Sequence, residues 1–183
     1  MKDLVRGKEK RNVSIVKDVD GASIVIINDI RFKGKSWDEW EAIKEYLKQY
    51  IGECYPIIKT SETIYIGEDF PDEFIGSEYT AHLWEEKKRA KANIIQGIPE
   101  LIQTADRGIV SPNKKAKHSV DAGCGWSVHR TRFALPKYER IQENYILTGY
   151  KLYQADLLVR RESADTLWLY DIINISRYST SNE

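Results

Sequence analysis

The chain of 183 residues contains little that marks a secreted, disulfide-linked or membrane-spanning protein. Its two cysteines, Cys54 and Cys124, are too few and too far apart for a disulfide framework or a Cys-x-x-Cys metal pair. No apolar run approaches the roughly 18 residues of a membrane-spanning helix. The N-terminus leads into charged residues, where a signal peptide would become apolar. We therefore expect a reduced protein in the cytoplasm, with no membrane association.

Residue patterns that identify common enzymes and cofactor sites are also missing. The sequence contains no GxGxxG, HExxH or GxSxG pattern. The run Gly34-Lys35-Ser36 resembles the end of a phosphate-binding loop, but Asp29 stands where that loop needs its earlier glycine. The run Asp18 to Gly21 resembles the start of a calcium loop but lacks the later ligands, so we predict a turn there. The sequence therefore predicts neither a metal site nor a cofactor.

The composition is that of one globular domain. Hydrophobic residues make up 42% of the chain and charged residues 31%, a mixture that can bury a core. Domains usually contain about 100–200 residues. We therefore expect a single domain over residues 1–183.

The charges balance overall but are unevenly distributed. Lys plus Arg equals Asp plus Glu, 28 each. Residues 36–86 contain three basic and 13 acidic side chains, whereas residues 107–140 contain eight basic and two acidic ones. A basic stretch of this kind suits the backbone of a nucleic acid. The alternative is a solvated loop that binds nothing.

The first half of the chain predicts a hairpin and two helices. The β-rich runs Val13 to Lys17 and Ala22 to Asn28 flank Asp20-Gly21, which is typical of a hairpin turn. Ser36-Trp37-Asp38-Glu39 is a capping box, and apolar residues at helical spacing follow it to about Gly52. We expect a second helix from Ser77 to about Gln96.

The second half predicts a long loop and a set of strands. Residues 105–125 form the loop, and the strands run over Trp126 to Leu135, Tyr145 to Arg161 and Leu167 to Ser176. The expected class is α+β, with a small N-terminal β-hairpin, two main helices and a C-terminal antiparallel β-meander of three to four strands.

The first of these C-terminal strands carries candidate phosphate-binding residues. Side chains alternate between the two faces of a strand. His129 and Thr131 share a face with apolar Phe133, which we expect to pack on helices, so Arg130 and Arg132 would project from the open face. Two such guanidinium groups can bind one phosphodiester.

A basic loop with a histidine precedes this strand, and we expect that histidine to lie over the open face. Histidine can serve as base or acid near pH 7, and arginine can stabilise a charged phosphorane. These are the groups that cleave RNA through its 2′-hydroxyl without a metal. We assign catalysis to His118, Arg130, Arg132 and Tyr170, and nucleic-acid binding to Lys114, Lys115, Lys117, His129 and Thr131. Alternatively, the two arginines pair with acids on neighbouring strands, such as Asp156 and Asp171.

Several short runs, in their order along the chain, resemble a known family. The module they resemble occurs in prophages and conjugative elements of Firmicutes, and we associate it with the barnase–EndoU–colicin–RelE-like (BECR) nuclease superfamily. The runs are Lys117-His118, Asp121-Ala122, Gly125-Trp126, Arg132 to Pro136, Leu157 to Arg160 and Leu169 to Ile172.

The resemblance implies a nuclease-like core over residues 61–183, in which a helical segment precedes a four-stranded antiparallel sheet. Residues 1–60 would then be an appendage of hairpin and helix. The resemblance also implies that His118 is catalytic and that Arg132 binds phosphate. Ser127 and Val128 depart from the aromatic or basic residues expected after Trp126, so the fold alone does not imply activity.

Three functions are consistent with the sequence. The first is a metal-independent, toxin-like endoribonuclease of a mobile element, whose partner is RNA. The alternative is a non-enzymatic inhibitor of a host nucleic-acid-binding protein, such as an anti-CRISPR protein that blocks a Cas nuclease. The acidic block, residues 36–86, can occupy the basic channel in which such an enzyme binds nucleic acid. A structural accessory protein of a phage is a third possibility. Convergence of His118, Arg130, Arg132 and Tyr170 on one anion would favour the enzyme.

Overall fold

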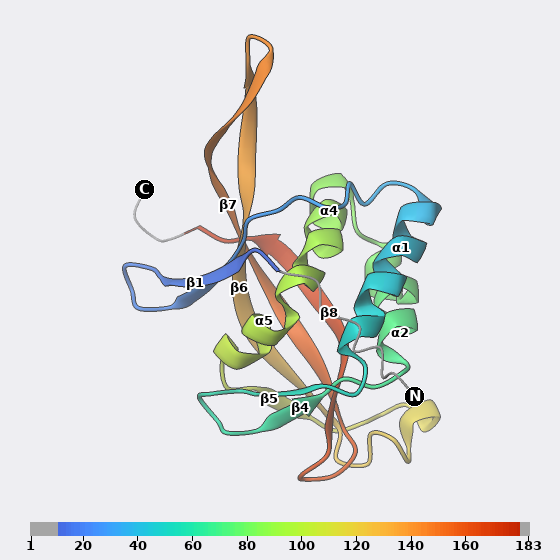
Figure 1. The fold of residues 1–183 in the computed structure, drawn as a ribbon. Helices are drawn as coiled ribbons and strands as arrows, with labels where there is room; N and C mark the ends of the chain where they lie inside the picture. Colours follow the sequence, from blue (N-terminus) through green and yellow to red (C-terminus); the bar gives the residue numbers. More distant parts are fainter. Residues whose placement is uncertain (1–10, 180–183) are drawn as a thin grey trace, which may run out of the picture.

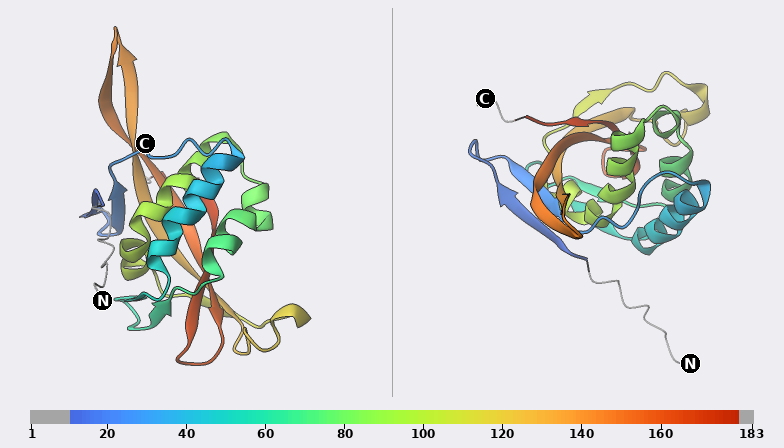
Figure 2. Two further views of the ribbon diagram at one scale, coloured as in Figure 1. Left: turned by 45° about the vertical axis from the view of Figure 1, so that its right-hand side comes forward. Right: turned by 90° about the horizontal axis from the view of Figure 1, so that it is seen from above.

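The computed structural model describes residues 11–179 as a large curled sheet that wraps around a layer of helices (Figure 1; Figure 2). The sheet is mixed and has the strand order β1-β2-β6-β7-β8-β4-β3, with β5 paired to β6 beside this path. The strands are β1 (Val13–Lys17), β2 (Ser23–Ile27), β3 (Cys54–Pro56), β4 (Thr63–Tyr65), β5 (Ile109–Ser111), β6 (Trp126–Ile141), β7 (Asn144–Arg161) and β8 (Leu167–Arg177).

The helices lie inside the curl of the sheet (Figure 2). They are α1 (Trp37–Leu47), α2 (Phe70–Gly76), α3 (Glu78–Ala81), α4 (Glu85–Ile94) and α5 (Ile98–Thr104), with 3₁₀ turns η1 (Lys48–Tyr50), η2 (Ile95–Gly97) and η3 (Ala116–His118). Apolar side chains from both layers form one core, which includes Ile43 of α1, Phe74 of α2, Phe133 of β6 and Ile172 of β8. Within the described residues, no helix is both long and apolar enough to cross a membrane.

The predicted arrangement of hairpin and meander is wrong, although the fold is roughly α+β. The N-terminal hairpin is not separate, because β2 pairs in parallel with β6, where Val25 lies opposite Phe133. Strand β4 likewise pairs in parallel with β8. The three long strands are therefore the middle of one sheet. Residues 11–60 share this sheet and this core with the rest of the described chain.

The second predicted helix is also wrong, because three shorter helices occupy residues 70–94. Helix α2 begins at Phe70 with Pro71 in its first turn, a position that proline favours. Ser77 then interrupts the helical path, since its hydroxyl accepts the Thr80 amide and starts α3. The chain turns again through Trp84, whose extended backbone precedes α4.

The first helix begins as predicted. The Ser36 hydroxyl accepts a hydrogen bond from the Glu39 amide at 3.3 Å. The Glu39 carboxylate accepts hydrogen bonds from the backbone amides of Lys33 and Lys35, so it holds the segment that leads into the helix. Trp40, Ile43 and Leu47 form the buried stripe that the spacing predicts.

A buried ion pair joins the helical layer to β8. The Lys91 ammonium lies 2.7 Å from Asp171 Oδ1, and both side chains are fully buried. Lys91 also donates to the Thr80 hydroxyl, and the Ser77 hydroxyl donates to Asp171 Oδ2, each at 2.6 Å. Burial raises the pKa of Asp171 and lowers the pKa of Lys91, while their mutual attraction opposes both shifts. The pair therefore fixes α3 and α4 against one strand of the sheet.

The β6–β7 hairpin extends far beyond the body of the molecule (Figure 1; Figure 2). We call its outer part, residues 137–150, the arm. Within residues 11–179, β2 pairs with β6 only at Val25–Phe133 and Ile26–Ala134, and β8 meets β7 only from Tyr153 inwards. Both outer edges of the arm are thus unpaired in the described chain. Its exposed side chains include Tyr138, Ile141, Tyr145, Ile146 and Leu147.

Candidate active site

A pocket of about 650 Å³ opens beside the basic loop that precedes β6. Three apolar side chains of the central strands line it, Val128 of β6, Leu158 of β7 and Ile173 of β8. These residues alternate with buried core residues such as His129 and Leu157, so they lie on the other face of the sheet. Both the basic loop and helices α2 and α3 contribute polar side chains to the pocket. The volume lies within the range of about 300–1,000 Å³ typical of ligand sites.

His118 lines this pocket and is held in place by a carboxylate. Its Nδ1 lies 3.2 Å from both carboxylate oxygens of Asp121. The 3₁₀ turn η3 ends at His118, and the Ala122 amide donates a hydrogen bond to the His118 carbonyl oxygen. The chain therefore turns back after His118, and this turn carries the Asp121 carboxylate next to the imidazole. With Nδ1 occupied, Nε2 is the nitrogen left to exchange a proton with a ligand. Nε2 makes no hydrogen bond to any residue within 11–179.

Two aromatic rings fix the orientation of the imidazole. The His118 ring stands edge-on to Trp126 and Tyr170, with centroid distances of 5.1 and 5.6 Å. His118 is only 6% exposed as a result. Tyr170 reaches this position through a β-bulge, since Leu169 and Asp171 pair with the adjacent residues Val159 and Leu158, and Tyr170 is the extra residue between them.

Sequence patterns do not identify Arg160, the guanidinium group that contacts Asp121. Arg160 Nη1 lies 2.9 Å from Asp69 and 3.4 Å from Asp121. Burial opposes the charge on Asp121, but the hydrogen bond from His118 and the Arg160 charge outweigh it and lower the pKa of this carboxyl. Arg160 lies opposite Trp126 in the β6–β7 register. Only that register, together with the position of the loop, brings Arg160 to the site.

Tyr170 is kept protonated in the pocket. Burial raises the pKa of its hydroxyl above the usual range, and the interaction with the Glu73 carboxylate raises it further. The hydroxyl is therefore a hydrogen-bond donor at neutral pH.

The three lysines predicted to bind nucleic acid line the same pocket. Lys114, Lys115 and Lys117 are exposed. Asn113 shapes their loop, since its side chain donates to the Lys115 carbonyl and accepts the Lys115 amide. The Trp126 indole donates to Asn113 at 3.3 Å and connects the loop to β6. The structure thus brings these lysines together with His118 and Tyr170.

The predicted arginine pair does not belong to this group. Arg130 Nε donates to Asp156 at 2.5 Å, and Arg130 Nη1 donates to Gln154 at 2.9 Å. Arg132 Nη2 lies 3.3 Å from Asp106. Neither arginine lines the pocket. Arg130 follows the alternative of a cross-strand ion pair with Asp156, whereas Asp171, the other suggested partner, binds Lys91.

His129 and Thr131 lie on the buried face of β6, as the alternation predicts. Ser127 contacts His129 Nε2 at 2.9 Å, and the Asp106 carbonyl contacts Nδ1 at 3.1 Å. Burial lowers the pKa of His129. The Thr131 hydroxyl donates to the Leu101 carbonyl. Neither side chain is accessible enough for the predicted contact with a nucleic acid.

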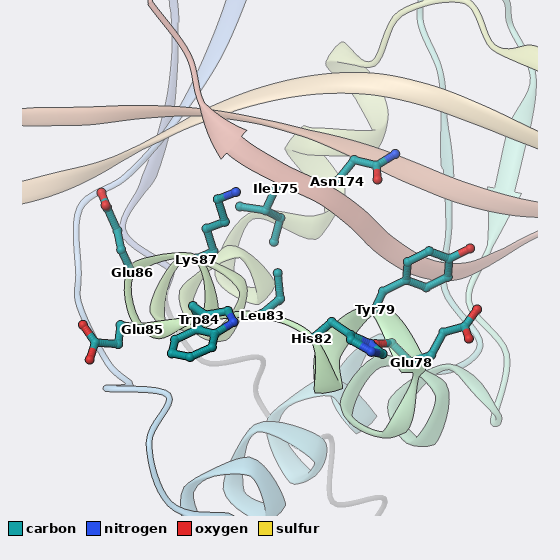
Figure 3. Close-up of a pocket in the computed structure, with 10 residues that line it drawn as sticks. All are labelled: Glu78, Tyr79, His82, Leu83, Trp84, Glu85, Glu86, Lys87, Asn174 and Ile175. Atoms are coloured by element: carbon teal, nitrogen blue, oxygen red, sulfur yellow. The ribbon is translucent and has the colours of Figure 1, made fainter.

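A second pocket of about 710 Å³ lies where α3 meets α4 (Figure 3). Trp84 stands on its rim and is 81% exposed. Three carboxylates of the acidic block also line it, Glu78, Glu85 and Glu86. Glu78 lines the first pocket as well, so it stands between the two.

Comparisons with known proteins identify no relative of this chain. The chain was compared with models of protein families, with curated proteins and with solved structures, and none of the three comparisons gives a match.

Proposed function

We propose that the protein is a metal-independent, endoribonuclease-like effector of a mobile genetic element that acts in the host cytoplasm. The observation that carries this proposal is the His118–Asp121 pair in a pocket lined by three lysines. A histidine whose other nitrogen is bound to a carboxylate has a fixed tautomer and an available Nε2. The lysines supply the positive charge that an RNA backbone needs.

The pocket residues can divide the steps of RNA cleavage between them. His118 Nε2 takes the proton of the 2′-hydroxyl, the 2′-oxygen forms a bond to phosphorus, and the bond from phosphorus to the 5′-oxygen breaks. The leaving 5′-oxygen takes its proton from a lysine ammonium group or from water. The lysines offset the developing negative charge, and the Tyr170 ring keeps the imidazole in place.

This assignment keeps His118 as the catalytic residue and Tyr170 as the ring that positions it, and it omits Arg130 and Arg132. Their guanidinium groups are held by Asp156 and Asp106. Arg160 acts only through Asp121, whose position and charge it supports.

Incubation of the purified protein with total RNA in EDTA tests the proposed function. We expect cleavage, because no step above needs a metal ion. We expect 2′,3′-cyclic phosphate ends, because the attacking oxygen belongs to the same ribose as the phosphate. RNA that stays intact at high protein concentration would refute the proposal.

The lysines should account for most of the RNA affinity. Changing Lys114, Lys115 and Lys117 to Glu reverses three charges at the pocket, so binding to all RNA sequences should weaken by at least about tenfold at low salt. The slope of log affinity against log salt should also become shallower. The control changes Lys17, Lys33 and Lys35 to Glu, which makes the same charge change elsewhere. Equal losses in both variants would show that only net charge matters.

A second candidate function rests on the pocket in Figure 3. Trp84 is exposed beside the Glu85 carboxylate, and such a pair suits a cationic side chain of a protein partner. This favours the alternative of an anti-CRISPR-like inhibitor that blocks a host nucleic-acid enzyme such as a Cas nuclease. Inhibition of such an enzyme that is lost in Trp84→Ala and kept in His118→Ala would support it.

A further inference from the structure

The walls of the active-site pocket carry opposite charges, and we infer that they orient one nucleotide of the substrate. The phosphate lies against the lysines, and a base with an exocyclic amino group lies against Glu78. The inference rests on the proposed function, because it specifies the substrate of the same pocket.

The cationic wall comes from a single loop. Lys114, Lys115 and Lys117 are exposed, and no ion pair holds their ammonium groups within residues 11–179. Asn113 anchors the backbone of the loop to the Trp126 indole. A phosphate at this wall lies on the same loop as His118, which is where the proposed cleavage needs it.

The acidic wall comes from α2 and α3. Glu73 is engaged with the Tyr170 hydroxyl. The Glu78 carboxylate has no hydrogen bond or ion pair to any described residue. Its backbone is fixed, because the preceding Ser77 caps α3 and donates to the buried Asp171. Glu78 is exposed and lines the pocket, so its carboxylate is an acceptor that a ligand in the pocket can reach.

The surface between the two walls suits a flat ring. Val128, Leu158 and Ile173 line the pocket with aliphatic side chains from three adjacent strands. A base can bury one face there and turn its edge towards α3. Adenine, guanine and cytosine each have an exocyclic amino group that can donate a hydrogen bond to a carboxylate. Glutamate accepts a hydrogen bond from the amino group of cytosine in this way. Uracil has no exocyclic amino group, and its one N–H on this edge lies between two carbonyl oxygens that the carboxylate repels.

Titration calorimetry with the four nucleoside 3′-monophosphates tests the inference. We expect the adenine, guanine and cytosine nucleotides to bind about tenfold more tightly than the uracil nucleotide, the preference that one charge-assisted base contact provides. Glu78→Gln keeps the shape of the side chain but offers an amide that also suits uracil, so the preference should disappear. Glu85→Gln removes a carboxylate from the other pocket only and should keep the preference.

The outcomes separate this inference from the proposed function. Equal binding of all four nucleotides, or a preference that survives Glu78→Gln, overturns the inference even if RNA is cleaved. A Glu78-dependent preference without RNA cleavage supports the inference and refutes the ribonuclease. Absence of both binding and cleavage overturns both.

Discussion

Replacement of His118 by alanine will lower the rate of RNA cleavage in EDTA by about 10²–10⁴-fold, the usual contribution of general acid–base catalysis. The imidazole is the acid–base group that takes the 2′-hydroxyl proton in our proposal, and its orientation by Asp121 has no effect once the ring is gone. Single-turnover cleavage of a labelled RNA measures the rate directly. RNA affinity should change little, because the lysines remain.

Two controls connect the lower rate to the imidazole itself. Removal of the ring leaves a small space beside Trp126 and Tyr170, so thermal unfolding must show that the variant is folded. His82→Ala removes an exposed histidine at the second pocket and should leave the rate unchanged. Wild-type rates in His118→Ala would refute the role of His118. If wild type and variant are equally inert, the inhibitor function becomes the better hypothesis.

Asp171→Ala will destabilise the protein by about 3–5 kcal/mol, because it leaves the Lys91 ammonium buried without a counter-charge. Lys91 is fully buried, and within residues 11–179 its ammonium group otherwise donates only to the Thr80 hydroxyl. The Ser77 hydroxyl loses an acceptor in the same variant. Urea unfolding at neutral pH measures the change in the free energy of unfolding.

The double variant Lys91→Met, Asp171→Leu separates lost charge from lost packing. Apolar residues of similar size often replace a buried ion pair at little cost. The double variant should therefore be more stable than Asp171→Ala alone. A loss below about 1 kcal/mol in Asp171→Ala would mean that water reaches Lys91 in solution.

Local features of this fold are predictable from the sequence. The start of α1 needs only Ser36 and Glu39, three residues apart, so the capping pattern identifies it. The two faces of β6 follow from alternation, which assigns His129 and Thr131 to the face that packs on the helices; their burial contradicts the nucleic-acid contact that we predicted for them. Neither inference needs a partner from elsewhere in the chain.

Features that depend on distant partners are not predictable in this way. The parallel pairs β2–β6 and β4–β8 join segments about 100 residues apart, and periodicity within a strand does not indicate its neighbour. The Ser77 hydroxyl also donates to Asp171, far along the chain, and no local pattern indicates that contact.

The candidate site follows the same division. The chemistry of His118, Tyr170 and the three lysines identifies them in the sequence, and the sheet brings them to one pocket. Arg130 and Arg132 have equally suitable chemistry; the cross-strand alternative correctly gives Asp156 as the partner of Arg130, but the sequence does not indicate that Asp106 binds Arg132. Arg160 escapes sequence reasoning for the same reason.

Insertions and deletions in the arm can change its length without changing the geometry of the pocket. A slip of one residue between β6 and β7 would turn either Val128 or Leu158 to the opposite face and destroy the pocket. The β-bulge between Lys137 and Tyr138 separates the register of the arm from that of the inner strands, which β2 and β8 hold on both sides. An insertion or deletion at the tip therefore shifts the register of the arm only, and the pairing of the inner strands at the pocket stays the same. The hairpin can become longer or shorter while the pocket keeps its shape.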